Sequence, residues 1–253
     1  PSPIFFSSIR RHSISASVSW ARRCVLETEV GLSARDSLIF AAESHVDRCL
    51  GYAHPLVESN LVGTQRLLDA ARSNGVGRYV QISTDEVYGS LGEQGRFTEE
   101  SPISPNNPYS ATKAGADFLV LAAHASHGMD VVITRCSNNY GPYQFPEKLI
   151  PRMICSALED EPLPIYGDGL HVRDWIHVED HCSAIDLVLR QGRPGEIYNV
   201  GSMHDIPNLD VVRGILRCLD KPDSLVRHVE DRPGHCLIYT SPSPRDRGCS
   251  RMP

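Results

Sequence analysis

Tyr109 and Lys113 are four residues apart in a segment with helical periodicity, so their side chains are expected to share one face of a helix. A tyrosine phenol has a pKa of about 10 in water and is a weak base at neutral pH, whereas a neighbouring ammonium group stabilises the phenolate and lowers that pKa. The pair could therefore remove a proton from a sugar hydroxyl while a hydride leaves the same carbon. The spacing by itself also fits an ordinary exposed pair.

Two adjacent carboxylic acids, Asp85 and Glu86, follow a predicted strand in the polar run at residues 83–89. Like charge and partial burial are expected to raise the pKa of at least one of them, so that the two provide both an acid and a base. The alternative is structural, because an aspartate such as Asp85 also suits the N-cap of a helix.

The elements that must position these residues follow from alternating apolar and amphipathic stretches, which predict an α/β fold. Strands are predicted at residues 37–42, 78–83 and 131–135, with helices at 60–74 and 109–127 between them. This order predicts a doubly wound, Rossmann-like parallel sheet, whose ligands bind beyond the carboxyl ends of the strands.

The composition of the 253 residues is typical of a soluble globular protein, with 41% apolar and 22% charged residues. A net charge of −6 without a basic stripe argues against nucleic-acid binding. No apolar run approaches the ~20 residues of a membrane helix, so no membrane association is expected. The eight cysteines are scattered without a CxxC pair, which favours reduced thiols and a cytoplasmic location.

Five sequence runs carry a family resemblance: FAAESHVDR at 40–48, STDEVYG at 83–89, PYSATK at 108–113, RCSNNYGP at 135–142 and VRDW at 172–175. Together, over about residues 37–235, they resemble the extended short-chain dehydrogenase/reductase family of NAD-dependent epimerases and dehydratases. Within this family they are similar to the dTDP-glucose 4,6-dehydratase branch.

The resemblance implies dehydration of dTDP-glucose to a 4-keto-6-deoxy sugar, with NAD regenerated in each turnover. Tyr109 would be the base at the C4 hydroxyl, and Lys113 would hold the nicotinamide ribose. Once C4 is a ketone, Glu86 would take the C5 proton and Asp85 would protonate the departing C6 hydroxyl. Thr84 would hydrogen-bond the sugar near C4, and the hydride would return to C6.

The resemblance also implies two sets of ligand-binding residues, for NAD and for dTDP-glucose or a similar nucleotide sugar. The residues expected to contact NAD are Ala41, Ala42, Ser44, Ser83, Tyr109 and Lys113. Those expected around the nucleotide sugar are Thr84, Asn138, Lys148, Leu149, Pro164, Tyr166, Arg173, Asn199 and Arg232. The basic members of the second set supply the charge that a pyrophosphate requires. A homodimer is implied for intact members.

Four segments are predicted along the chain: an atypical, disordered segment at 1–36, a partial NAD-binding domain with the catalytic residues at 37–141, an interleaved nucleotide-sugar-binding region at 142–235, and a disordered tail at 236–253. The first glycine is Gly31, so no Gly-rich strand-to-helix turn precedes Ala41. We therefore expect an N-terminally incomplete chain that lacks the first βα unit.

Three alternatives remain at this point. The chain could be an incomplete or inactive family member without NAD binding, because the missing turn presents backbone N–H groups to the pyrophosphate. It could be a nucleotide-sugar C4 epimerase, although the Asp85–Glu86 pair favours the dehydratase. His177 and His181 are spaced for a metal, but no third ligand is evident and no metal is expected.

Overall fold

The computed structural model describes residues 36–39, 53–91, 95–231 and 238–239, with side chains described for all but the first and last of these ranges. The described residues form two compact units through which the chain passes more than once. The first unit comprises those up to Ser83, with Pro108–Thr134 and Gly192–Ile197, and the second comprises Thr84–Asn107, Arg135–Gln191 and those from Tyr198 onward. These boundaries differ from the sequence division at residue 141, which stays a prediction about function.

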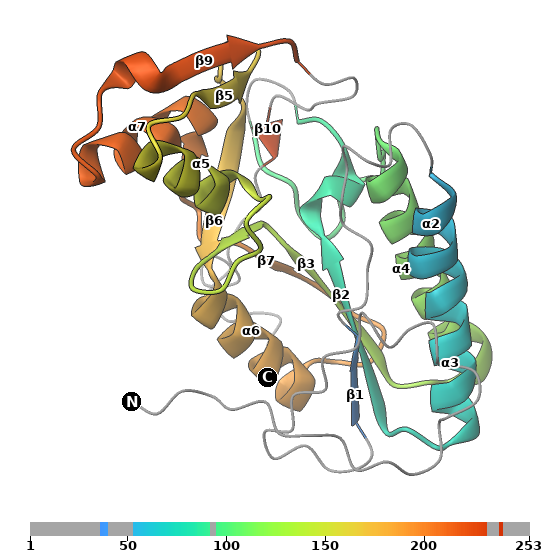
Figure 1. The fold of residues 1–253 in the computed structure, drawn as a ribbon. Coiled ribbons are helices and arrows are strands. Elements are labelled where there is room, and N and C mark those ends of the chain that lie inside the picture. The colour runs from blue at the N-terminus through green and yellow to red at the C-terminus, as the bar shows by residue number, and fades with distance from the viewer. Residues whose placement is uncertain (1–35, 40–52, 92–94, 232–237, 240–253) are drawn as a thin grey trace. The chain divides into compact units, whose positions relative to one another are not determined.

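A four-stranded sheet with the strand order β1-β2-β3-β7 contains the strands of the first unit, whereas the last residues of β2 and β3 and all of β7 after Ile197 are assigned to the second unit. Its strands are β1 (Asp36–Ile39), β2 (Arg78–Thr84), β3 (Val131–Cys136) and β7 (Ile197–Val200). β1 and β2 pair in parallel, with Asp36 opposite Arg78. Helices connect β1 to β2 and β2 to β3, so the predicted order of strand, helix, strand, helix, strand is confirmed (Figure 1).

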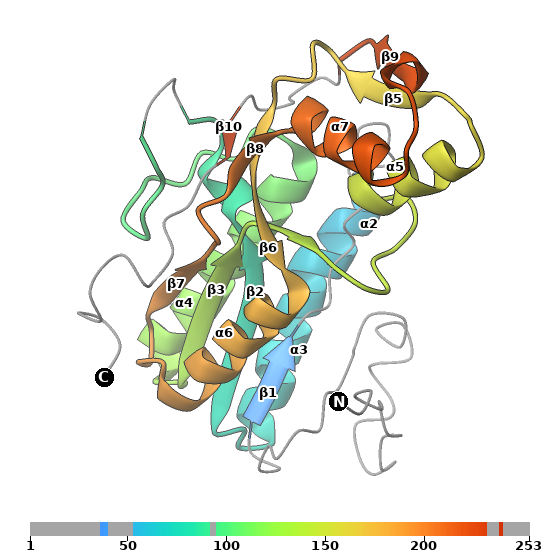
Figure 2. The same ribbon diagram turned by 90° about the vertical axis from the view of Figure 1, so that its left-hand side faces the viewer.

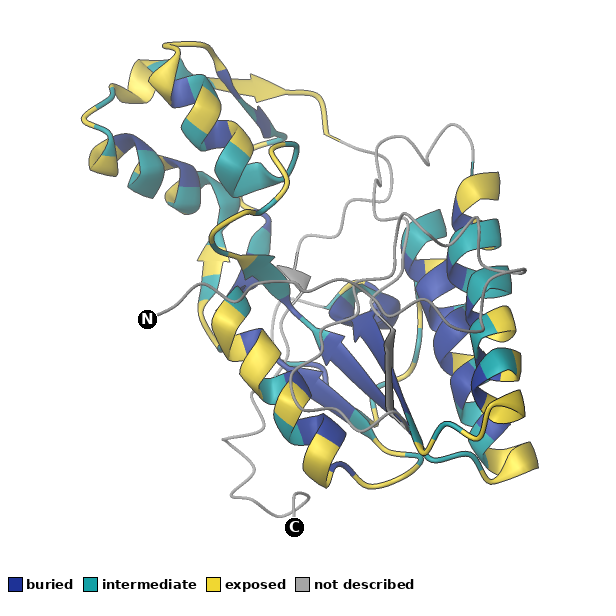
Figure 3. Cartoon of the chain, turned by 60° about the horizontal axis from the view of Figure 1, so that its bottom comes forward, coloured by how far each residue is buried: buried dark blue, intermediate teal, exposed yellow. Residues whose placement is uncertain are grey.

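The helices of the first unit cover the sheet with apolar faces. α2 (His54–Leu56), the π-helical turn η2 (Val57–Val62) and α3 (Gly63–Ser73) follow one another without a break, so the helix predicted from residue 60 begins earlier, where Pro55 occupies its first turn. α4 (Pro108–His127) packs beside α3. Figure 3 shows β2 and β3 buried and these helices buried on one side only. The shared core contains Leu68, Ala71, Tyr79, Val120, Ala123, Val131 and Ile133.

The second unit contains shorter elements, in keeping with its proline-rich sequence. They are the 3-10 turn η3 (Asp85–Tyr88), β4 (Asn138–Tyr140), α5 (Leu149–Leu158), β5 (Leu163–Tyr166), β6 (Val172–His177), α6 (Val178–Gln191), β8 (Asp205–Pro207), α7 (Asn208–Cys218), the 3-10 turn η4 (Asp223–Leu225), β9 (Val226–Val229) and β10 (Ile238–Tyr239). β6 pairs in parallel with β4 and antiparallel with β8. α5 and α7 lie side by side (Figure 2) and share a core with β5.

The prediction of a wholly disordered tail at 236–253 was wrong for two residues. Ile238–Tyr239 forms β10, which pairs in parallel with β6 and places Ile238 opposite Val172. The Ser/Pro-rich composition on which that prediction rested reports local propensity only, whereas an available strand edge supplies backbone hydrogen bonds to a β-prone pair of residues. Among the described helices, none combines the length and the apolar content that a membrane span requires.

Candidate active site

Tyr109 and Lys113 lie one turn apart near the start of α4, in the first unit. The Lys113 side chain is buried, and its Nζ donates a hydrogen bond to the carbonyl oxygen of Ile82, 2.6 Å away, near the end of β2. Tyr109 is half-buried. The hydrogen bond from Lys113 therefore anchors this face of α4 near the carboxyl end of β2.

The rotation of α4 is fixed by contacts with the preceding helical segment. Asn60 donates from Nδ2 to Oγ1 of Thr112 at 3.0 Å, between two buried side chains. One turn along, a Cβ added to Gly115 would come within 2.7 Å of the Leu61 side chain, so glycine permits the close approach. These contacts hold Tyr109 and Lys113 on a defined face of the helix.

The turn after β2 begins with Thr84 and carries both predicted acids, in the second unit. The Thr84 hydroxyl accepts a hydrogen bond from the backbone N–H of Glu86 at 3.3 Å, and it donates to Oδ1 of Asp85 at 3.4 Å. Thr84 is therefore the N-cap of η3, and the alternative in which Asp85 caps a helix was wrong. The Asp85 side chain is instead directed into the interior, with 2% of its surface exposed.

Burial raises the pKa of Asp85 well above its usual value, and electrostatic interactions with the acidic groups of Cys136, Glu86 and Asp174 act in the same direction. The Arg173 guanidinium opposes them with a smaller effect than burial. Oδ2 of Asp85 has no hydrogen-bond partner among the described residues. These surroundings favour a protonated carboxyl group, which can act as a proton donor near neutral pH.

Glu86 has different surroundings although it is the next residue. It is half-buried, and its Oε2 accepts a hydrogen bond from Nδ2 of Asn107 at 3.2 Å. Two neighbouring carboxyl groups in unlike environments are the arrangement that gives one group the role of acid and the other that of base.

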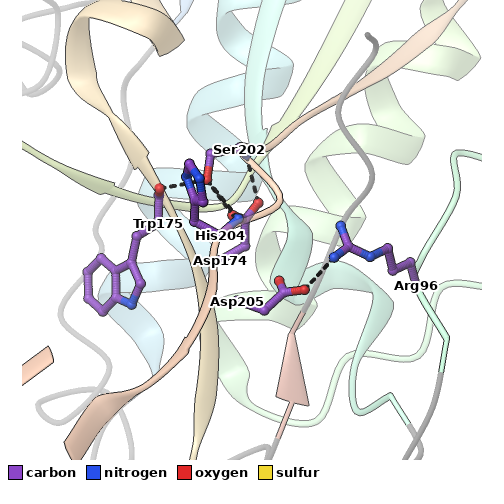
Figure 4. Close-up of polar contacts among 6 residues, drawn as sticks. All are labelled: Arg96, Asp174, Trp175, Ser202, His204 and Asp205. Carbon is purple, nitrogen blue, oxygen red and sulfur yellow. Dashed lines mark hydrogen bonds and ion pairs between the residues drawn. The ribbon is translucent and has the colours of Figure 1, made fainter. Parts of the chain in front are cut away.

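Asp174 follows Arg173 on β6, and its side chain is buried. Its carboxylate joins this strand to the loop between β7 and β8 through hydrogen bonds (Figure 4). Its Oδ1 accepts from Oγ of Ser202 at 2.7 Å and from N–H of His204 at 3.0 Å, and its Oδ2 accepts from N–H of Ser202 at 2.9 Å. Close to these hydrogen bonds, Arg96 and Asp205 form an ion pair at 2.5 Å. The strand that carries Arg173 and Asp174 is therefore fixed where it faces Asp85.

The residues predicted around the nucleotide sugar fall in the second unit, apart from one that is not described. They are Asn138 in β4, Lys148 and Leu149 at the start of α5, Pro164 and Tyr166 in β5, Arg173 in β6 and Asn199 in β7. Arg232 lies outside the described residues, as do Ala41, Ala42 and Ser44 of the cofactor set, whereas Ser83 is buried at the end of β2.

Asn199 is placed unfavourably for its predicted role. Its side chain is fully buried, and Oδ1 accepts a hydrogen bond from the hydroxyl of Tyr88 at 2.7 Å. Its position in the interior argues against direct contact with a nucleotide. Asn208, which the sequence did not single out, begins α7 and has an Oδ1 without a partner among the described residues, so it is the better candidate for a polar ligand contact.

His177 and His181 make protein contacts that explain their spacing. His177 ends β6, and its Nδ1 accepts from the N–H of Glu179 at 3.3 Å, in the first turn of α6. His181 donates from Nδ1 to Oδ1 of Asn139 at 2.8 Å, and burial lowers its pKa to about 4. Within the described ranges, no three His, Cys, Asp or Glu side chains are grouped to hold a metal ion.

The parallel sheet and the polar residues after its strands define an α/β protein with a Rossmann-like sheet. The family model "NAD dependent epimerase/dehydratase family" matches residues 36–201, so the chain belongs to that family.

Individual relatives agree with this assignment. The chain is 51% identical over 210 residues to a dTDP-glucose 4,6-dehydratase of Streptomyces niveus, covering 83% of this chain and 62% of the relative. It is similar, with a TM-score of 0.81 and 49% identity, to the crystal structure of a dTDP-glucose 4,6-dehydratase from Streptomyces venezuelae with NAD and TYD bound, covering 85% of this chain and 67% of that one. A UDP-glucuronic acid 4-epimerase from Bacillus cereus, solved with UDP-glucuronic acid and NAD, reaches a TM-score of 0.79 at 27% identity, covering 85% and 68%. The chain thus spans less than two thirds of the Streptomyces niveus relative.

Proposed function

We propose that this chain carries the catalytic residues of a dTDP-glucose 4,6-dehydratase, a lyase of deoxysugar biosynthesis, and converts dTDP-glucose to dTDP-4-keto-6-deoxyglucose with NAD. The observation that carries the proposal is the contrast between Asp85, buried with a raised pKa, and Glu86, half-buried and bound to Asn107. Epimerisation at C4 needs no acid for a C6 hydroxyl, so this contrast favours the dehydratase. The identity to dehydratases, 51% against 27% for the 4-epimerase above, supports the same choice.

In the proposed reaction Tyr109 removes the proton of the C4 hydroxyl, while Lys113 binds the nicotinamide ribose. The C4 ketone then makes the neighbouring C5–H acidic, and Glu86 removes that proton. Asp85 donates its proton to the C6 hydroxyl, which leaves as water, and Thr84 hydrogen-bonds the sugar near C4. When bound, NAD would accept the C4 hydride and return it to C6.

The described residues on the nicotinamide side fit NAD. Lys113 is held against the end of β2 through Ile82, and Tyr109 lies one turn away with part of its side chain accessible. Ser83 follows Ile82 on that strand and is buried. Titration calorimetry with NAD tests this part of the proposal: micromolar affinity supports it, and no measurable heat at millimolar NAD would contradict it.

The nucleotide sugar would be bound largely by the second unit. Lys148 and Arg173 supply positive charge for the pyrophosphate, with Asn138, Leu149, Pro164 and Tyr166 around the nucleotide. Arg232 completes the proposed set from outside the described residues.

The deciding experiment is incubation of the chain with dTDP-glucose and NAD, followed by measurement of the alkaline absorbance that a 4-keto-6-deoxy product develops. Its appearance supports the dehydratase. Conversion to dTDP-galactose without that absorbance would identify an epimerase, and no conversion despite NAD binding would identify an inactive member.

We also propose that the protein acts as a cytoplasmic homodimer. The four described cysteines are free thiols, as in a reducing compartment. On the first unit, Phe118 of α4 has 56% of its surface exposed and Val57 of η2 has 40%. Large apolar side chains exposed on packed neighbouring helices are typical of a helix-to-helix dimer interface.

A further inference from the structure

Tyr88, the last residue of the turn that carries Asp85 and Glu86, has a fixed set of buried hydrogen bonds. Its hydroxyl donates to Oδ1 of Asn199 at 2.7 Å and accepts from Nη1 of Arg135 at 3.0 Å. An amide oxygen can only accept and a guanidinium can only donate, so the direction of both bonds is determined. Burial raises the pKa of Tyr88, even though Arg135 opposes this, so the phenol keeps the proton that it donates.

The Tyr88 ring is held as firmly as its hydroxyl. The guanidinium carbon of Arg135 lies 4.9 Å from the ring centroid, a distance typical of a cation–π contact. The ring of Phe97 stacks on that of Tyr88 with centroids 5.0 Å apart and an interplanar angle of 19°. The side chain of Tyr88 is therefore fixed in both position and rotation.

The backbone on either side of the turn is also fixed. Thr84 caps its start, as described above, and N–H of Ser104 donates to the carbonyl oxygen of Val87 at 3.1 Å. After Tyr88 the chain leaves through Gly89 at φ +79°, where an added Cβ would come within 2.0 Å of the Ser104 carbonyl oxygen. Only glycine fits this exit from the turn.

Burying an arginine side chain costs free energy, because its charged group loses its hydration. Arg135 is among the largest fully buried side chains, and an apolar residue of similar volume would avoid its desolvation penalty. What Arg135 provides, and an apolar residue cannot, is a directed bond from the end of β3 to the Tyr88 hydroxyl. Asn199 provides the second bond from β7, so two strands hold one turn.

We propose that Arg135 and Tyr88 are positioning residues, which hold Asp85 and Glu86 in the geometry needed for proton transfer at C5 and C6. This inference rests on the proposed dehydratase function. Proton transfer requires the acid and base to be within hydrogen-bonding reach of the sugar, and a misplacement of about 1 Å can cost roughly 10²-fold in rate. Neither residue needs to touch the substrate to have this effect.

The central variant is Tyr88→Phe, which keeps the ring but leaves Arg135 and Asn199 without their shared partner. Tyr79→Phe is the matched control, because Tyr79 is also buried and its hydroxyl donates to Oε1 of Gln81 at 3.3 Å, in the core of the first unit. If Tyr88→Phe fails to fold, Arg135→Lys is the second variant, since it retains the charge but cannot place a donor and a stacking plane together.

Two measurements separate positioning from packing. With dTDP-glucose and NAD, Tyr88→Phe should lower kcat for dehydration by about 10- to 100-fold with KM within twofold of wild type, while reduction of NAD by C4 oxidation persists. In carbon-13 NMR of aspartate-labelled protein, with Asp85→Asn used to assign the signal, the Asp85 carboxyl should titrate at a lower pH in Tyr88→Phe, because a loosened turn admits water. Tyr79→Phe should leave both quantities at wild-type values.

The NMR titration needs neither substrate nor cofactor, so it decides the inference even if wild-type protein makes no product, an outcome that would count against the proposed function alone. A Tyr88→Phe variant that is less stable, but that keeps the wild-type Asp85 titration and kcat, would overturn the inference. For Arg135→Lys the same two quantities decide the inference: kcat for dehydration and the pH at which the Asp85 carboxyl titrates.

Discussion

At the scale of single residues, the two neighbouring carboxyl groups differ through their surroundings. Asp85 is enclosed beside Cys136, Arg173 and Asp174, whereas Glu86 is half-buried and bound to one amide. Adjacent positions in the sequence thus acquire unlike surroundings, and the proposed function gives them separate roles.

We expect Glu86→Gln to abolish solvent exchange at C5 while C4 oxidation remains detectable, because an amide cannot accept the C5 proton. The measurement is deuterium incorporation at C5 by NMR, alongside the absorbance of reduced cofactor. Glu159→Gln, an exposed glutamate after α5, is the control. Exchange at the wild-type rate in Glu86→Gln would show that another group is the base.

Asp85 also makes a prediction about pH and stability. Its folded-state pKa is raised, so between the unfolded value of about 3.9 and the folded value the unfolded chain loses a proton that the folded chain retains. Wild type should therefore lose stability relative to Asp85→Asn as pH rises through this window, by at most about 1.4 kcal/mol per pH unit. Urea unfolding from pH 4 to 8 measures the difference, with the exposed Asp220→Asn as control. A pH-independent difference would contradict the burial argument.

At the scale of elements, turns and caps position the side chains of the proposed active site. The helix face with Tyr109 and Lys113 depends on α4 being locked to η2 and to the end of β2. The acids depend on η3, a turn too short to be stable alone, which is held by its cap and by long-range contacts.

Gly89→Ala should disrupt this turn far more than Gly75→Ala, although both glycines have positive φ, +79° and +63°. Gly75 has open space around an added Cβ, so its substitution should cost only the left-handed strain, about 1–2 kcal/mol. Gly89 adds the clash with Ser104, and we expect a total of about 3–5 kcal/mol. Chemical denaturation compares the two, and equal losses would refute the steric explanation.

The buried His181 of α6, which is hydrogen-bonded to Asn139 of β4, predicts a second dependence of folding stability on pH. His181 has a folded pKa of about 4, against about 6.5 when unfolded, because it is buried. Its contribution to stability is present above pH 6.5 and is lost as the pH falls toward 4, by about 3 kcal/mol in total. In His181→Gln the loss of stability between pH 7 and pH 4 should be smaller than in wild type. In the control His127→Gln, which changes an exposed histidine, the loss should equal that of wild type. Unfolding curves at pH 7, 5.5 and 4 measure the effect, and an unchanged acid loss in His181→Gln would rule out this residue.

At the scale of the whole molecule, the chain forms two compact units and the proposed catalytic residues are divided between them. Tyr109 and Lys113 belong to the first unit, and Thr84, Asp85 and Glu86 to the second. The chain passes from the first unit to the second between Ser83 and Thr84 and returns between Asn107 and Pro108, so each group lies close in sequence to one of these two crossings.

The proposed homodimer predicts that Phe118→Glu converts a dimer to a monomer, because a charge would be buried in the apolar contact between helices. Light scattering coupled to size exclusion measures the mass. Leu158→Glu, which changes a similarly exposed residue of α5 in the second unit, should leave the mass unchanged. A wild-type monomer at micromolar concentration would refute the dimer.

The sequence by itself determined the alternating strands and helices up to residue 135, the spacing of Tyr109 and Lys113, and the adjacency of Asp85 and Glu86, since periodicity and chain neighbourhood are local properties. It left open the alternative that Asp85 caps a helix, which the Thr84 cap rules out, and it placed Asn199 with the ligand-binding residues although its side chain is buried against Tyr88. Only the tertiary structure decided which carboxyl is buried and what holds its turn. The reason is physical, because the groups that set the pKa of Asp85 and the position of Tyr88 come from β3, β6 and β7, which are distant in the chain and meet only when it folds.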